Sequence, residues 1–337
     1  MCMMQVLNKA AAGACLWSLL QSCNANDAGI SYTDYINPDT VTPIGITADS
    51  TVYQQRLLHL VHNKPSDKWP VDKEEPLPRA ILPYNRILAY YGNFYTPAMG
   101  VLGIPEQEML TRLKAEAARW QSADTVLPVL PALHYIAVTA QSQPGTSGKY
   151  RLRMPVTQLD KAVSMAADNH LLLFFDVQVG LSTLQEELPP LEPYLRMPGV
   201  HLGIDPEYSM KNKAVPCTTI GTFDAAEINY AISFLAGIVK RYHLPPKVLV
   251  VHRFTQAMLT NYKNIRVVPE VQVVINMDGF GSPAKKIDSY KGFVSREPVQ
   301  FTGFKLFYKV DPQTGKRIME PAEVIALYPS PVYIQYQ

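Results

Sequence analysis

The sequence is poor in cysteine, which excludes a domain held together by a framework of disulfide bonds. Of the four cysteines, Cys2, Cys15 and Cys23 lie near the start of the chain and only Cys217 lies further along. Folding must therefore rest on a hydrophobic core. The 337 residues, 47% of them hydrophobic, are enough for one large domain or two small ones.

The sequence also lacks any block of basic residues, any RNA-binding signature and any zinc-finger spacing. Lys and Arg are scattered and the formal net charge is only +2, so we do not expect nucleic acid as a partner. Metal-binding spacings such as His-x-His, or Glu-x-x-x-His on a helix, are absent as well. The spacing therefore identifies no metal site, and we predict neither a metal nor another cofactor.

The first apolar run, Ala10–Leu20, is too short to span a membrane and follows the positive charge of Lys9. This layout is typical of a signal peptide. The next residues, Leu20-Gln21-Ser22-Cys23, resemble a bacterial lipobox in which Cys23 is lipidated. We predict a signal peptide over residues 1–22 and a lipid anchor on Cys23, which would hold the protein at the bacterial cell envelope, on the outer membrane or the cell surface. The alternative is a plain secretory signal followed by a chance cysteine.

Residues 23–83 are predicted to form a polar tether and an irregular, proline-rich lead-in. From residue 84 to 337, short apolar runs alternate with helical patterns. Strands are predicted over residues 87–91, 129–138, 171–175, 200–205, 248–251, 271–277, 302–308 and 332–336. Helices are predicted over residues 105–120, 157–168, 182–195, 224–242, 254–262, 283–290 and 322–327.

Eight strands alternating with helices over about 250 residues match the (β/α)8 barrel, or TIM barrel. The alternative is an open doubly wound sheet. That fold usually carries a glycine-rich phosphate loop after its first strand, and this chain has none there.

The stretch from Val200 to Glu207 sends a predicted buried strand directly into two acids, Asp205 and Glu207. Residues two apart on an extended backbone point to the same side, and Pro206 should end the strand. The carboxyl ends of barrel strands form one mouth, where active sites lie. Other polar side chains predicted at this mouth are Tyr90, Tyr91, Asn93, His134, Asp176, His252, Asp278, Gln335 and Tyr336.

Several acids that converge on one mouth repel each other, so one of them should hold a proton near neutral pH. We predict that Glu207 is this general acid and that Asp205 stays ionised beside it. Asp278 would adjust the pKa values of this pair, and Asp176 would be a fourth catalytic residue. We predict that the remaining residues bind substrate, namely Tyr90, Tyr91, Asn93, His134, His252, Gln335 and Tyr336.

Each of these residues also has a simpler interpretation. Asp205 before a proline is a common turn residue, and Asp176 could cap the following helix. His134 and His252 could be packed core histidines. Asp278 precedes Gly-Phe-Gly, where an aspartate often serves local hydrogen bonding.

The Asp-x-Glu pair of Asp205 and Glu207 resembles the strand ending of the family 18 chitinase and family 25 lysozyme barrels. The segment 89–93 is similar to the start of family 18 barrels, and 277–278 is similar to their sixth strand. The segment 334–336 is similar to the Trp-Gln-Tyr ending of family 25. The resemblance implies that Glu207 is the acid. It also implies that Asp205 helps the acetamido group of the substrate to attack the anomeric carbon, as in family 18.

The chain departs from both families. Family 18 has further aspartates in the fourth strand, where this chain has Val200 and Gly203, and family 25 has an aspartate on the first strand, where this chain has Tyr90 and Tyr91. Tyr-Tyr-Gly-Asn, Gly-Val-Leu-Gly at 100–103, Gly-Ile-Asp-Pro-Glu and Val-Val-His-Arg-Phe-Thr at 250–255 resemble a group of bacterial lipoproteins of unassigned function. That resemblance implies a barrel at the envelope and no particular activity.

We therefore expect a monomeric glycoside hydrolase that acts on an envelope or extracellular glycan. One alternative is a metal-dependent hydrolase such as a phosphodiesterase, with ligands drawn from Asp176, Asp205, Glu207, His252 and Asp278. The other is a non-catalytic glycan-binding lipoprotein on the same scaffold.

Overall fold

The structure is a computed structural model that describes residues 50–337 apart from residues 72 and 212. The predicted signal peptide, the predicted lipidation site Cys23 and the tether up to residue 49 lie outside the described residues.

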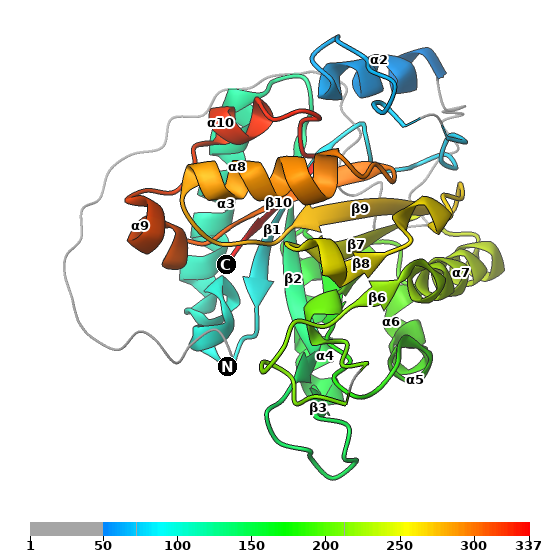
Figure 1. The fold of residues 1–337 in the computed structure, drawn as a ribbon, viewed down its shortest axis with the longest axis vertical. Coiled ribbons are helices and arrows are strands. Elements are labelled where there is room, and N and C mark those ends of the chain that lie inside the picture. The colour runs from blue at the N-terminus through cyan, green and yellow to red at the C-terminus, as the bar shows by residue number, and fades with distance from the viewer. Residues whose placement is uncertain (1–49, 72, 212) are drawn as a thin grey trace.

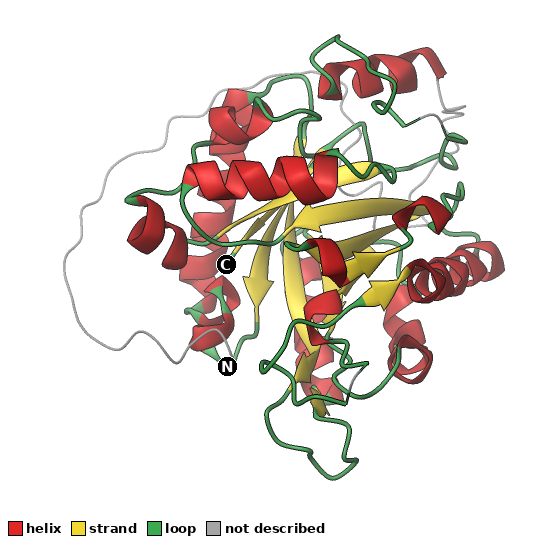
Figure 2. Cartoon of the chain, viewed as in Figure 1, coloured by secondary structure: helices red, strands yellow, loops and turns green. Residues whose placement is uncertain are grey.

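Eight parallel strands close into a barrel. They are β1 (Arg86–Gly92), β2 (Val129–Ala140), β4 (Leu172–Val177), β5 (Val200–Ile204), β7 (Lys247–Arg253), β9 (Val271–Met277), β10 (Phe301–Leu306) and β11 (Tyr333–Tyr336). Each strand pairs in parallel with its neighbour in this order, and β1 pairs with both β2 and β11, which closes the ring. The strands lie at the centre of the molecule with helices around them (Figures 1 and 2). The predicted (β/α)8 barrel is therefore confirmed.

The helices around the barrel largely follow the prediction. They are α3 (Glu106–Ala123), α4 (Val156–Asp168), α5 (Leu184–Glu187), α6 (Glu192–Leu195), α7 (Ala225–Tyr242), α8 (Pro283–Ser289), α9 (Val310–Gly315) and α10 (Pro321–Ile325). Helix α7 begins with the expected capping box of Asp224 and Glu227. The two prolines of the 182–195 segment divide it into α5 and α6, joined by a 3-10 turn over Pro189–Leu191. Within residues 50–337, no helix combines the length and apolar character needed to cross a membrane.

The helix predicted over residues 254–262 is wrong. This segment forms 3-10 turns and the short strand β8 (Leu259–Thr260), which pairs with β6 (Phe223–Asp224). The reason lies in Arg253, whose guanidinium lies 3.1–3.4 Å from the backbone carbonyls of Thr255, Gln256 and Leu259. A helix would use such carbonyls for its own hydrogen bonds. A further strand that was not predicted, β3 (Arg151–Arg153), pairs antiparallel with the end of β2.

Two hydrophobic clusters reflect the alternation of side chains along each strand. Outward residues such as Leu88 and Tyr90 pack against the helices, whereas inward residues such as Ile87 and Ala89 fill the lower barrel. Helix α2 (Ser50–Leu60) contributes three side chains to the inward cluster, Tyr53, Leu57 and Leu60. It lies beyond the amino ends of β1 and β2 (Figure 1). This part of the lead-in therefore helps to close the bottom of the barrel.

Cys217 is disulfide-bonded. The other three cysteines of the sequence lie outside the described residues.

Candidate functional site

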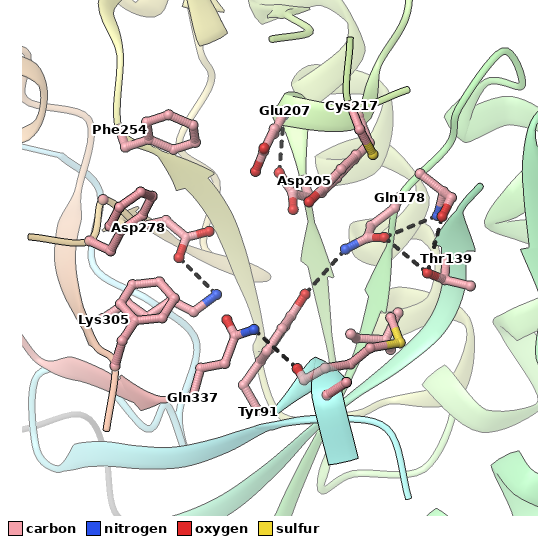
Figure 3. A pocket seen from close by; sticks show the side chains of 18 residues that line it. Tyr91, Thr139, Gln178, Asp205, Glu207, Cys217, Phe254, Asp278, Lys305 and Gln337 are labelled. Carbon is pink, nitrogen blue, oxygen red and sulfur yellow. Dashed lines mark hydrogen bonds and ion pairs between the residues drawn. The ribbon is translucent and has the colours of Figure 1, made fainter. Parts of the chain in front are cut away.

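A cavity of about 120 Å³ opens at the carboxyl ends of the strands. Glu207 and Asp205 line one side, and Asp278 and Lys305 face them from the other (Figure 3). Tyr91 forms part of the floor. The remaining lining includes the polar residues Thr139, Gln178 and Gln337 and the aromatic residues Tyr208, Phe254, Phe280 and Phe307. The cavity therefore combines charged groups with aromatic faces.

The acids Asp205 and Glu207 are positioned by a turn rather than by an extended strand. Strand β5 ends at Ile204, and Pro206–Tyr208 form a 3-10 turn. The Asp205 carboxylate caps this turn, because its Oδ1 accepts a hydrogen bond from the backbone N–H of Glu207 at 3.0 Å. Asp205 is therefore both a turn residue and a cavity residue, and both acids reach the same cavity.

The two acids differ in how they hold a proton. Burial, and then the negative charge of Asp278, raise the pKa of Glu207 to about 7. Asp205 is only 2% exposed, and burial raises its pKa well above the usual range. Burial therefore favours the protonated form of Asp205, which is opposite to the tendency expected from the sequence. Glu207 is the acid that titrates near neutrality.

The pKa of Asp278 is lowered, in contrast to the raised pKa values of Asp205 and Glu207. Its Oδ1 lies 2.8 Å from Lys305 Nζ, and its Oδ2 lies 3.1 Å from His252 Nδ1. Although burial raises the pKa of Asp278, Lys305 and His252 lower it more, so it falls below the usual range. The Lys305 ammonium also lies 4.0 Å from the centre of the Tyr91 ring. Asp278 thus faces the cavity as an ion-paired carboxylate.

Four of the predicted residues lie deeper in the barrel than the cavity, one inward-facing position before the residues that line it. Asp176, His134, His252 and Gln335 each precede by two residues a side chain that lines the cavity, and each is fully buried. The predicted placement of these four at the mouth is therefore wrong, since residues two apart on a strand share a face but differ in depth.

Hydrogen bonds tie this lower layer to the cavity floor. The Tyr91 hydroxyl donates a hydrogen bond to Asp176 Oδ2 at 2.9 Å. Burial lowers the pKa of His134 to about 4. Burial also lowers the pKa of His252, but the charges of Asp278 and Asp176 outweigh it and bring the value to about 10.

Three other predicted residues face away from the cavity. Tyr90 follows the outward face of β1 and its hydroxyl lies 2.9 Å from that of Tyr308. Asn93 donates a hydrogen bond to the Tyr135 hydroxyl at 3.0 Å. Tyr336 points toward helix α3, and the neighbouring Gln337 lines the cavity instead. The predicted placement of Tyr90 and Tyr336 at the mouth is wrong, because neighbouring residues on a strand point to opposite faces. The placement of Asn93 is also wrong, because β1 ends at Gly92 and the alternation of the strand does not continue to Asn93.

The outward placement of Tyr336 predicts a structural effect. Its hydroxyl donates to Glu116 Oε1 at 2.8 Å and accepts from Trp120 Nε1 at 3.0 Å. Tyr336→Phe leaves both buried partners short of a hydrogen bond, so we expect the free energy of unfolding to fall by about 1–2 kcal/mol. Urea denaturation measures this. The control, Tyr95→Phe, changes a ring that is 59% exposed and should leave stability unchanged. Equal stability of the two variants would contradict the outward placement.

A search with protein-family models finds no match to the sequence, and a search of curated proteins finds none either. Among solved structures, the chain is similar to the crystal structure of a hyperthermophilic endo-β-1,4-glucanase in complex with substrate. The similarity covers 75% of this chain and 89% of the glucanase chain, with 10% sequence identity and a TM-score of 0.39. Function must therefore be inferred from the chemistry of the cavity.

Proposed function

We propose that the protein is a glycoside hydrolase in which Glu207 is the general acid. The observation that carries this proposal is a carboxyl group with a pKa of about 7 that shares a cavity with an ion-paired carboxylate, Asp278. Glycosidases usually act with two carboxyl groups whose environments give them different pKa values.

In this mechanism, protonated Glu207 donates its proton to the glycosidic oxygen as the bond to the anomeric carbon breaks. Positive charge develops on the sugar ring, and the carboxylate of Asp278 stabilises it from the other side of the cavity. Water then adds to the anomeric carbon and returns a proton to Glu207. The resemblance to family 18 supports a role for Asp205 in holding an acetamido group. The raised pKa of Asp205 favours its protonated form, which can do so by donating a hydrogen bond.

The aromatic residues of the cavity support a ring-shaped polar substrate. Tyr208, Phe254 and Phe280 offer apolar faces beside the charged groups. The lipobox-like segment ending at Cys23 supports an envelope or extracellular glycan as substrate, reached by a protein that is anchored through lipid.

The metal-dependent phosphodiesterase is less well supported. Asp278 pairs with Lys305, and the Asp205 carboxylate caps the turn. Two of the three acids of the cavity therefore already have partners that a metal ion would have to displace.

The pKa of Glu207 predicts how activity depends on pH. A general acid works only while protonated, so kcat/KM should fall as pH rises through about 7 and should drop about tenfold per pH unit above it. The measurement is a pH–rate profile between pH 5 and 9, on nitrophenyl glycosides and on N-acetylated envelope glycan fragments. A profile that stays flat to pH 9 would argue against Glu207. Measurable binding of these glycans without turnover would instead favour a non-catalytic lipoprotein.

A further inference from the structure

Directly below the cavity floor, three side chains from three strands turn donor atoms toward one another. They are His134 on β2, Asp176 on β4 and His252 on β7, and each is fully buried. Asp176 Oδ1 lies 3.3 Å from His134 Nε2 and 3.4 Å from His252 Nε2. All three atoms lie within 4.8 Å of one another.

The two contacts of Asp176 Oδ1 are long for hydrogen bonds, and the one with protonated His252 is an ion pair. Within the described chain, none of the three atoms has a hydrogen-bond partner. An N–H···O bond is usually about 2.9 Å long, and burying such atoms without partners is unfavourable. Two ligand atoms at about 2.0–2.1 Å from a tetrahedral metal ion lie roughly 3.3–3.4 Å apart. The spacing around Asp176 Oδ1 therefore matches that of atoms around a common ion.

The opposite end of each side chain is held by a second group. His252 Nδ1 lies 3.1 Å from Asp278 Oδ2, and Asp176 Oδ2 accepts from the Tyr91 hydroxyl at 2.9 Å. His134 Nδ1 lies 2.5 Å from the Tyr333 hydroxyl and 3.0 Å from the side-chain amide of Gln335. In the empty site His252 holds a proton on both nitrogens, because its pKa is about 10. A metal ion would displace the Nε2 proton, and each imidazole would keep its hydrogen on Nδ1, which faces Asp278 in His252 and the Tyr333 hydroxyl in His134. Partners of this kind orient the ligands in metalloproteins.

The fourth wall of this space is a glycine. Gly203 lies on β5 between β4 and β7. A Cβ at this position would lie 2.3 Å from His134 Nε2 and 2.6 Å from Asp176 Oδ1. Because Gly203 has no side chain, His134 and Asp176 can pack directly against its backbone with their donor atoms turned toward each other.

We propose that His134 Nε2, His252 Nε2 and Asp176 Oδ1 bind one divalent transition-metal ion of the Zn²⁺ class. Two imidazoles and one carboxylate suit Zn²⁺ and its neighbours, whereas Mg²⁺ and Ca²⁺ prefer oxygen ligands. The ion ties β2, β4 and β7 together inside the barrel. The three residues lie below the cavity wall, so the ion's role is structural. The sequence spacing gave no sign of this site, because its ligands come from three separate strands.

The test uses the folded protein after treatment with a chelator and dialysis. We expect a Zn²⁺ titration to reach one ion per chain and to raise the unfolding midpoint by roughly 5 °C or more at saturation. Co²⁺ should give the visible absorption bands of a four-coordinate ion. Absence of stoichiometric binding, or of any shift in the midpoint, would overturn the proposal without the use of any variant.

Variants locate the ion. Asp176→Asn and His252→Gln should each weaken Zn²⁺ binding by about 100-fold or more. The matched control is His201→Asn, which changes another fully buried histidine whose Nδ1 accepts from the backbone N–H of Val248 at 3.2 Å. It should leave Zn²⁺ affinity unchanged. If all three variants bind Zn²⁺ as the parent protein does, the ion is bound elsewhere and the assignment is wrong.

Discussion

Glu207→Gln is expected to lower kcat by about 100-fold or more on glycosides with alkyl leaving groups, while the barrel stays folded. The size of the effect follows from the usual contribution of a general acid, which is 100-fold to 10,000-fold. Glutamine occupies nearly the same volume and cannot give up a proton. The variant therefore removes proton donation with little change in the shape of the cavity. Steady-state kinetics on matched substrates measures it.

A comparison of substrates with different leaving groups tests this prediction most directly. A dinitrophenyl leaving group departs without protonation, so the same variant should retain most of its activity on dinitrophenyl glycosides. Glu108→Gln serves as the control, since this glutamate lies on the outer helix α3 in an exposed ion pair with Arg112. Equal losses on both kinds of leaving group would mean that Glu207 positions the substrate and does not protonate it.

The stability of Glu207→Gln shows whether its loss of activity comes from the missing proton donor or from damage to the fold. The pKa of Glu207 lies above its value of 4.5 in an unfolded chain, so the folded state holds the proton more tightly. Its carboxyl group therefore destabilises the fold increasingly as pH rises from about 4.5 to 7. Glu207→Gln should consequently be more stable than the parent above pH 7, by about 3 kcal/mol. A destabilised variant would point to a structural loss instead.

The arrangement of the barrel was largely readable in the sequence. Short apolar runs that end in a polar residue, such as those before Asp176 and Asp278, indicate parallel strands buried on both faces. Parallel strands in a barrel end at the same mouth, and this rule is what brought Asp205, Glu207 and Asp278 together in the prediction.

The sequence did not show how deep each side chain lies in the barrel or which face of its strand it occupies. Tyr90 and Tyr91 are chemically alike, and only the register of β1 decides that Tyr91 points inward. Lys305 was missed because Phe301–Leu306 reads as an ordinary apolar strand with one lysine. Its inward position becomes apparent once Gly303 and Phe301 are seen to share that face. The raised pKa of Asp205 was missed for a similar reason, since it depends on how deeply the carboxyl group is buried.

Gly203→Ala is expected to be the most damaging small substitution in the barrel, although it adds a single methyl group. The added Cβ would come within 2.6 Å of both His134 and Asp176, closer than real Cβ contacts. Neither side can yield easily. β5 is fixed by parallel pairing of Gly203 with Asp176 on one side and Val250 on the other. Both side chains are fully buried.

We therefore expect Gly203→Ala to lower the free energy of unfolding by about 3 kcal/mol or more, because overpacking is combined with the disruption of a buried ionic contact. Gly199→Ala is the matched control. It lies just before the same strand, and an added Cβ there meets no atom within 4 Å. Its effect should be neutral or slightly stabilising, since alanine restricts the unfolded chain. Urea denaturation of both variants separates the two cases. If Gly203→Ala proved as stable as Gly199→Ala, His134 and Asp176 would have room to move apart, and the close packing inferred beneath the cavity floor would be wrong.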